Sequence, residues 1–452
     1  MPPALDHTAI RAQIASETAA WGPLSQQELA NRLGVSQPTI SRALRNYPRA
    51  LRVQRGPAAR VLIARDVHGV GHSAPVFRVD EHVRLVPDGT LYPVFDHGFF
   101  WEWLDGTTRL FQGWPYLLDP LRPSGFLGAC IASQHPELQL PTRIADCTDD
   151  DLFRFATKAA WNMPGDRIVG IRAQQRFLEA TQIAPRPLAH ELRVEHARRV
   201  DDVLGGDPGS LVDGQQPKFV SYVRGRACIV KFSPSPDDDP SVAQRWADLL
   251  VSEHLALQTL REHGLSAAHT AITTNNGRVF LEIERCDRVG EHGRRGVLSL
   301  HALAAEFAEA PATDWRSAAN ELVAKGLFDP DHVTLLARLQ TFGRLIGNID
   351  MHLGNASVFL DGRSVRNVTP AYDMLPMLWA PSRDTLPHPD FEPVPAALHE
   401  RPHFPAMCDA ALDFWNRVQR DARISPSFRD IATQAFTRLT SMTGTFSAGP
   451  PG

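Results

Sequence analysis

At 452 residues the chain is too long for one hydrophobic core, and its length predicts two to four domains. Hydrophobic residues make up 43% and charged residues 22%, without a long apolar run or a signal peptide at Met1, so we expect a cytoplasmic protein that does not engage a membrane. The net charge is −4, yet residues 1–65 hold nine arginines against three acidic residues, and only this region is expected to seek polyanions.

The first predicted elements are two short helices separated by a glycine. Ser25 and Glu28 have the spacing of a capping box at the start of a helix, which Gly34 ends. Ser36 begins the second helix, and residues 50–56 and 59–64 alternate like two strands of a wing. Residues 25–44 resemble the helix-turn-helix of bacterial transcription regulators, which predicts a winged helix-turn-helix domain over 1–67.

In such a domain the second helix enters the major groove of DNA. We expect Gln37 and Arg42 to contact base edges and Thr39 and Arg45 to contact phosphates, with Ser41 on the same outward face. A helical packing module without DNA binding is the alternative, but the surplus of arginine favours DNA.

The second region, residues 77–204, indicates strands over 77–86 and 91–100. Pro87, Asp88 and Gly89 between them predict a hairpin turn. A cluster of aromatic residues from Phe99 to Tyr116 is interpreted as core. This region by itself indicates no chemistry.

A glycine-rich segment over 205–218 begins a third region, because such loops bring backbone NH groups close to phosphates. The following strand, residues 227–232, is apolar up to Lys231, one of only four lysines in the chain, and we expect this ammonium to bind ATP phosphates. Glu253 on the next helix is its expected partner, with Asp248 and Glu262 as rivals. The backbone of Glu282 and Glu284, in the strand that follows, is expected to meet an adenine edge.

The strongest pattern comes later, where Asp350 and Asn355 are separated by four residues and Asp373 follows a predicted hairpin. One carboxylate to accept a proton and two oxygen ligands for Mg²⁺ are what phosphoryl transfer requires. The sequence therefore predicts a catalytic base at Asp350 and metal ligands at Asn355 and Asp373.

Taken together, four motifs resemble the HipA family of bacterial serine/threonine kinases, which are toxins of toxin-antitoxin systems. They are Gly214-x-Gln216-Pro217-Lys218, Arg285-x-Asp287-Arg288, Asn348-x-Asp350-x-His352-x-x-Asn355 and Thr369-Pro370-x-Tyr372-Asp373. The resemblance implies catalysis by Asp350 and Lys231, Mg²⁺ at Asn355 and Asp373, and ATP contacts from Gly214, Gln216, Lys218 and Lys231. It also implies a protein substrate in translation, an aminoacyl-tRNA synthetase.

Two features depart from the family pattern. This chain carries its own helix-turn-helix, whereas the family's usual partner is a separate DNA-binding antitoxin, so it resembles the branch with a fused N-terminal domain. Leu211 stands where the family often has an autophosphorylated serine, and Ser210 beside it is the candidate phosphosite. A palindromic operator favours a homodimer.

The predicted fold class is α+β. It comprises a bilobal kinase-like fold, with a mixed nucleotide-binding lobe over 205–290 and an all-α catalytic lobe over 291–440, preceded by the winged head and ended by a disordered tail over 441–452. Three other hypotheses stay open. The kinase fold could sense nucleotide for a transcription regulator without phosphotransfer, the phosphate acceptor could be a small molecule, or the polar motif residues could only cap helices and turns.

Overall fold

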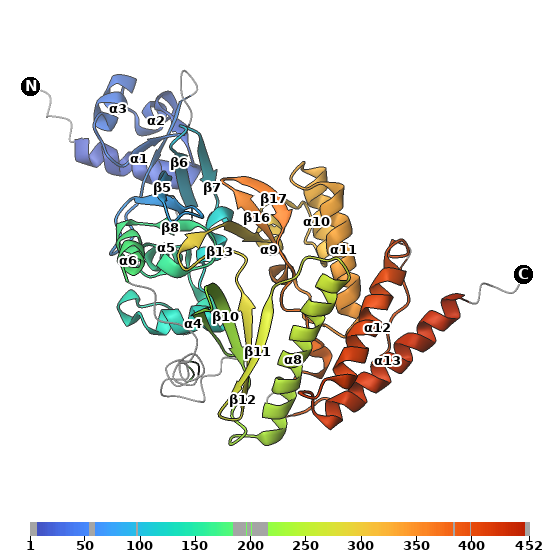
Figure 1. The fold of residues 1–452 in the computed structure, drawn as a ribbon. Coiled ribbons are helices and arrows are strands. Elements are labelled where there is room, and N and C mark those ends of the chain that lie inside the picture. The colour runs from blue at the N-terminus through green and yellow to red at the C-terminus, as the bar shows by residue number, and fades with distance from the viewer. Residues whose placement is uncertain are drawn as a thin grey trace, which may run out of the picture. The chain divides into compact units, whose positions relative to one another are not determined.

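The computed structural model describes residues 7–53, 59–95, 98–183, 196, 200, 216–382, 385–397 and 399–447. The chain divides into two compact units, residues 1–124 with 128–184, and residues 125–127 with 185–452. The predicted region 1–67 falls in the first unit, and so does the predicted region 77–204 up to residue 184, apart from residues 125–127. The predicted regions 205–290 and 291–440 fall in the second unit. Helices and strands occur in both units, so the fold is a mixture of α and β (Figure 1).

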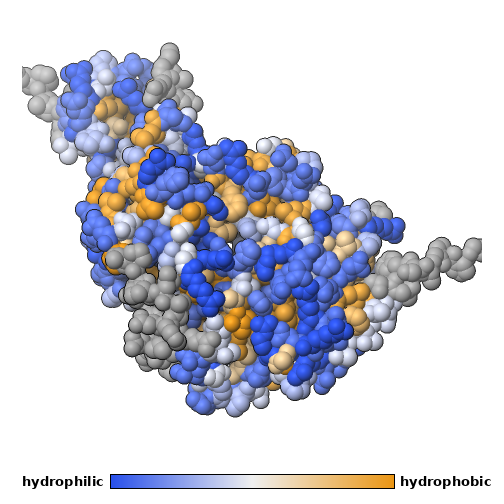
Figure 2. Space-filling view, viewed as in Figure 1, coloured by the Kyte–Doolittle hydropathy of each residue, from blue (hydrophilic) through white to orange (hydrophobic). Residues whose placement is uncertain are grey.

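In the first unit, residues 7–65 form a region that we call the head. Its helices and strands are α1 (His7–Trp21), α2 (Gln26–Leu33), α3 (Gln37–Leu44), β1 (Leu24–Ser25), β2 (Ala50–Arg52) and β3 (Arg60–Ile63). The strands pair antiparallel in the order β1-β3-β2, and the turn between β2 and β3 lies outside the described residues. In Figure 2 the visible surface of the head is mainly hydrophilic, because its apolar side chains pack inward.

The capping box predicted at the start of α2 is confirmed. Ser25 Oγ accepts the amide of Glu28, and Glu28 Oε2 accepts the amide of Ser25 at 2.7 Å. Gly34 ends the helix in the left-handed conformation, with φ of 64°, which glycine adopts without steric cost. Leu29 and Ile40 then pack in the core against Ile14 of α1. Local capping therefore determines where α2 begins and where it ends before α3.

A five-stranded antiparallel sheet in the order β7-β6-β5-β4-β8 forms the rest of the first unit. The strands are β4 (Ala74–Val79), β5 (Leu85–Val94), β6 (Gly98–Trp103), β7 (Thr108–Phe111) and β8 (Arg167–Val169). The helices of this region are α5 (Asp149–Lys158) and α6 (Ile171–Thr181). A further helix, α4 (Gly125–Ser133), has its first three residues in the second unit and the rest in the first. Leu51 and Leu62 of the head share a hydrophobic cluster with Val94 and Phe100 of this sheet.

The hairpin turn predicted at Pro87–Gly89 is wrong. These residues lie inside β5, and the chain reverses instead before Leu85, where Val83 has φ of 66°. A Cβ atom at Gly89 would lie 2.2 Å from the carbonyl oxygen of Glu102 on β6. Glycine is required there by the close approach of two strands and not by a turn.

The second unit contains a four-stranded antiparallel sheet in the order β11-β12-β10-β9 within the described residues. Its strands are β9 (Lys218–Val223), β10 (Arg226–Phe232), β11 (Thr270–Asn275) and β12 (Arg278–Glu284). The long helix α8 (Pro240–Glu262) runs beside β11 and β12 (Figure 1). Asp239 caps it through Oδ1, which accepts the amides of Ser241 and Val242.

Residues 291–440 are not all helical, contrary to the prediction. The helices are α9 (Leu300–Phe307), α10 (Trp315–Ala324), α11 (Pro330–Leu345), α12 (Phe404–Arg420) and α13 (Pro426–Ser447). The strands are β14 (Gly293–Arg294), β15 (Gly296–Ser299), β16 (Ser357–Asp361) and β17 (Ser364–Val368), and β14 pairs with β13 (Arg288–Val289) just before this region. Strands β15, β16 and β17 form a sheet because Val358 and Leu360 alternate with more exposed residues and bury one face.

The disordered tail was predicted to start at residue 441, but α13 continues to Ser447, so the predicted start is too early. Within this helix the hydroxyl groups of Thr433, Thr437, Thr440 and Ser441 donate to carbonyls four residues earlier. No helix of the described residues is long and apolar enough to cross a membrane.

Candidate active site

A buried ion pair joins β10 to α8 in the second unit. Lys231 Nζ lies 2.8 Å from Glu253 Oε1 and 2.7 Å from Oε2, and the two side chains are 5% and 0% exposed. The same ammonium also donates to Asp373 Oδ1. The strand lysine and the helix glutamate predicted as partners are therefore brought together, and Asp373 joins them from a position 142 residues further along.

The rival carboxylates on α8 have other partners. Asp248 Oδ1 accepts the amide of Ser425 at 2.8 Å and Oδ2 accepts its hydroxyl at 2.6 Å, so it holds the start of α13. Glu262 pairs with Arg417 on α12. Asp248 and Glu262 thus bind α8 to the helices around it, while Glu253 alone of the three meets Lys231.

These charges shift one another's pKa values. Although burial by itself lowers the pKa of Lys231, Asp373 and Glu253 raise it above the usual value for lysine. Burial would raise the pKa of Asp373, but Lys231 and Lys218 hold it below the usual value. At neutral pH the site therefore contains a protonated lysine and an ionised Asp373.

The loop that carries Asp350 is fixed by Asn348, which is 6% exposed. Asn348 Oδ1 accepts the amide of Asp350 at 3.0 Å, and its Nδ2 donates to the carbonyl oxygen of Asp373 at 3.1 Å. One amide side chain thereby links the predicted base to the segment of the predicted metal ligand. The Asp350 carboxylate stays half exposed, which leaves it accessible to a substrate hydroxyl.

Asn355 is oriented by the same loop, because its Nδ2 donates to the carbonyl oxygen of Asp350 at 2.8 Å. This bond commits the amide nitrogen and assigns the opposite side, Oδ1, as the group available to a cation. No cluster of three His, Cys, Asp or Glu side chains able to hold a metal occurs among the described residues. Two protein oxygens suit Mg²⁺, which usually retains waters and binds substrate phosphates.

The side of the site predicted to bind phosphate contains a second lysine and an unsatisfied hydrogen-bond donor. Lys218 lies opposite Lys231 in the pairing of β9 with β10, and burial lowers its pKa. Gln216 Nε2 is buried without a hydrogen-bond partner, so a ligand acceptor would satisfy it. These donors fit a nucleotide phosphate, and Asn355 with Asp373 fits Mg²⁺. Gly214 and Ser210 lie outside the described residues.

The expected contact between Glu282 and an adenine edge does not fit the structure. Glu282 lies in β12, opposite Val230 of β10 on one side and Ala271 of β11 on the other. Its backbone groups therefore face neighbouring strands. The amide of Glu284 donates to the carbonyl of His269 at 2.8 Å, and its side chain pairs with Arg226, so any adenine contact there stays a prediction.

Comparisons with known proteins identify the family. A model of the YjjJ-like toxin middle domain matches residues 70–178, and a model of the HipA-like C-terminal domain matches residues 210–441. Toxin YjjJ of Escherichia coli strain K12 is 34% identical over 428 residues, which cover 91% of this chain and 94% of that protein. The chain belongs to the YjjJ-like toxins.

A solved structure resembles this YjjJ-like toxin in fold. It is the HipA, HipB and operator DNA complex of the toxin-antitoxin system of Shewanella oneidensis MR-1, with a TM-score of 0.50 and 16% identity, over 81% of this chain and 97% of that chain. The HipA-like C-terminal domain of the family contains every side chain of the site just described, from Gln216 to Asp373. The head lies outside both matched domains.

In the head of this YjjJ-like toxin, most side chains predicted to contact DNA are accessible. Gln37, Arg42 and Arg45 are exposed and Ser41 is half-buried along α3. Thr39 is the exception, since it is only 6% exposed and its hydroxyl lies 2.9 Å from that of Ser36. The helical period places Thr39 beside Ile40 on the inner side, so a phosphate contact from Thr39 does not fit the structure.

Three residues of the toxin site received no role from sequence reasoning, although all stand in its motifs. Asn348 links the two acidic segments. His352 Nδ1 accepts the amide of Gly354 at 3.0 Å, which places the ring proton on Nε2, 3.8 Å from Asp350 Oδ1. The hydroxyl of Tyr372 donates to the carbonyl of Gly354 at 3.0 Å and lies 2.8 Å from Ser357 Oγ. Their positions beside Asp350 and Asp373 in the sequence motifs were the signal from which a role in the site could have been predicted.

Proposed function

We propose that the second unit is an ATP- and Mg²⁺-dependent serine/threonine protein kinase, and that phosphorylation of a protein is how this toxin acts. The observation that carries the proposal is the convergence of Lys231, Glu253 and Asp373 beside a loop in which Asn348 ties Asp350 to Asp373. Phosphoryl transfer needs three parts. Here they are the Lys231 ammonium held by Glu253, the accessible Asp350 carboxylate, and oxygen atoms of Asn355 and Asp373 for a metal ion.

The roles follow from each residue's surroundings. Bound ATP would supply the γ-phosphoryl group, with Mg²⁺ neutralising its charge. Lys231 and Lys218 bind phosphate oxygens, Glu253 holds Lys231 in place, and Asn355 and Asp373 hold the metal. Asp350 orients the acceptor hydroxyl and takes its proton as the hydroxyl oxygen bonds to the γ-phosphorus, while the bond from that phosphorus to the β–γ bridging oxygen breaks and ADP leaves. Asp373, which contacts Lys231, would also be the carboxylate that holds the metal.

The acceptor in this proposal is a serine or threonine of an aminoacyl-tRNA synthetase, on the basis of the HipA resemblance. Ser210 is proposed as a second, internal acceptor that regulates the site. Cytoplasmic action suits both ATP supply and a target in translation.

We further propose that the head is a winged helix-turn-helix domain that binds DNA for autoregulation, as part of a homodimer. The HipA structure from Shewanella oneidensis was determined with HipB and operator DNA. In this toxin the exposed Gln37 and Arg42 on α3 and the exposed Arg45 directly after it, with the β2–β3 hairpin nearby, support a DNA contact made by the chain itself.

The kinase proposal is tested by incubating the protein and a cell lysate with labelled ATP and Mg²⁺. Wild type should label a lysate protein, Asp350→Ala should not, and Asp361→Ala, an exposed aspartate on β16 outside the site, should behave like wild type. Labelling by Asp350→Ala at the wild-type rate would refute the assignment. Nucleotide binding without any labelling by wild type would favour a nucleotide-sensing regulator instead.

A further inference from the structure

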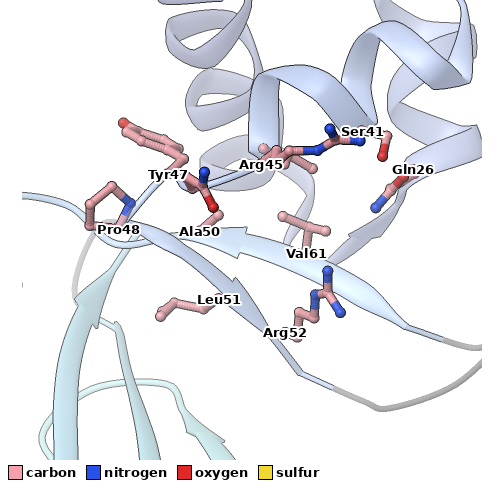
Figure 3. Close-up of a pocket in the computed structure, with 11 residues that line it drawn as sticks. Gln26, Ser41, Arg45, Tyr47, Pro48, Ala50, Leu51, Arg52 and Val61 are labelled. Atoms are coloured by element: carbon pink, nitrogen blue, oxygen red, sulfur yellow. The ribbon is translucent and has the colours of Figure 1, made fainter.

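The head contains a pocket of about 500 Å³ between the end of α3 and the β2–β3 hairpin. Ser41, Arg45, Asn46 and Tyr47 line it from α3 and the residues after it, Gln26 lines it from the start of α2, and Arg52 lines it from β2. Figure 3 shows Gln26 and Arg45 on the helical side and Arg52 on the strand below them. The pocket lies entirely within the first unit.

Most arginines of the head already have partners. Arg32 pairs with Glu17 at 3.1 Å, Arg49 with Asp66 at 3.2 Å and Arg60 with Glu28 at 3.6 Å. Arg65 pairs with Asp150, and Arg11 donates to the carbonyl of Ala43 and covers the ring of Tyr47.

Three described arginines of the head, Arg42, Arg45 and Arg52, have neither a carboxylate nor an aromatic ring as partner. Arg42 donates to the carbonyl of Pro38 on its own helix. Arg45 and Arg52 are exposed, and both line the pocket. Within the part of the head that the structure describes, the unneutralised arginine charge therefore lies on α3 and at this pocket.

The chemistry of the lining is that of an anion site. It offers two guanidinium groups, the amides of Gln26 and Asn46 and the hydroxyl of Ser41, and it includes no carboxylate. Guanidinium groups match phosphate oxygens in geometry as well as charge. The base of the pocket is firm, because Leu51 and Val61 are 6% and 4% exposed and belong to hydrophobic clusters.

We propose that this pocket binds a phosphate group, clamped between Arg45 at the end of α3 and Arg52 of β2. Its favoured source is the backbone of duplex DNA, in which case the inference rests on the proposed DNA binding and adds Arg52 and Gln26 to it. Arg45 then fixes the register of α3 on the duplex, while Arg42 and Gln37 remain free to read bases. A free phosphate compound is the other source of the same chemistry.

The test uses the full chain and a labelled duplex of mixed sequence, with binding measured by fluorescence anisotropy between about 50 and 200 mM salt. The one phosphate held in the pocket contributes about 0.9 to the slope of log K against log salt, so the double variant Arg45→Gln/Arg52→Gln should reduce the slope by about one, and each single variant by less. Arg60→Gln is the matched control, since Arg60 lies on the adjacent strand but pairs with Glu28. Its slope should equal that of wild type.

A second arm measures labelling of individual arginines by phenylglyoxal, with peptide mass spectrometry, in the presence of inorganic phosphate. Suppose that inorganic phosphate slows labelling of Arg45 and Arg52 but not of Arg60, while the variants keep the wild-type salt slope of DNA binding. This result would support the pocket, with a free phosphate compound as its ligand. Unchanged slopes together with no selective protection would overturn it. If wild type binds no duplex, the DNA proposal fails, and protection by phosphate still decides the pocket.

Discussion

Lys231 and Glu253 form a buried ion pair with an N–O distance of 2.7 Å, and Asp373 completes it from the other side of the site. Two carboxylates thus hold one ammonium. Such a pair leaves a buried uncompensated charge when one partner is removed, which is more costly than the loss of a surface pair. The arrangement fixes the position of the lysine side chain.

Glu253→Gln should therefore destabilise the protein as well as inactivate it. We expect a loss of about 3 kcal/mol in the free energy of unfolding, because Lys231 stays buried with only Asp373 as a charged partner. Urea unfolding measures this value. Glu262→Gln, on the same helix but in an exposed pair with Arg417, should cost less than about 1 kcal/mol. Equal losses in the two variants would contradict the argument.

Asn355→Ala should alter the response to magnesium. Loss of one of two protein oxygens should raise the Mg²⁺ concentration needed for half-maximal phosphotransfer by about tenfold or more. A magnesium titration of the labelling assay measures the change, with Asn367→Ala on the exposed face of β17 as the control. An unchanged magnesium requirement in Asn355→Ala would remove Asn355 from the metal site.

Gly347 permits the turn between α11 and Asn348. It has φ of 73°, and a Cβ atom there would lie 2.7 Å from the ring of Trp379, whereas Gly264 has φ of 75° and open space around it. Gly264→Ala should cost about 1 kcal/mol from backbone strain alone. Gly347→Ala should cost about 2 kcal/mol more because of the clash, and should lower phosphotransfer by moving Asn348. Unfolding and activity of the two variants test this, and equal effects would refute it.

His254 on α8 should make stability depend on pH. Burial, with Arg423 and Arg261 nearby, lowers its pKa from 6.5 to about 4, and its Nδ1 lies 2.8 Å from Thr270 Oγ1. As pH falls below 6.5 the unfolded chain takes up a proton that the folded chain does not accept until about pH 4. Stability is therefore lost progressively as pH falls from 6.5 towards 4.

The His254→Gln variant should show less of this loss. Urea midpoints at about pH 7.5 and pH 5 should differ less for the variant than for wild type. His301→Gln, at an exposed position, should retain the wild-type difference. A wild-type pH dependence in His254→Gln would assign the effect to other groups.

Residues close together in the chain were predicted well. The capping box at Ser25 and Glu28 and the glycine end of α2 depend only on neighbours within a turn of helix, so local spacing determines them. The strand that ends near Lys231 and the loop from Asp350 to Asn355 are likewise visible in the residue pattern. The prediction of a turn at Gly89 was wrong, because the sequence does not distinguish a glycine needed for close packing of strands from one needed for a turn.

The sequence by itself determined the chemical groups of the site and their order: a lysine on a strand, a glutamate on a helix, and the Asp350, Asn355 and Asp373 triplet. Only the tertiary structure decided which of three glutamate and aspartate residues on α8 meets Lys231, that Asn348 joins Asp350 to Asp373, and that Thr39 faces inward. The physical reason is distance along the chain. Contacts between residues 22 or 142 positions apart depend on how α8, β10 and the loop after α11 pack, and a residue pattern does not specify that packing.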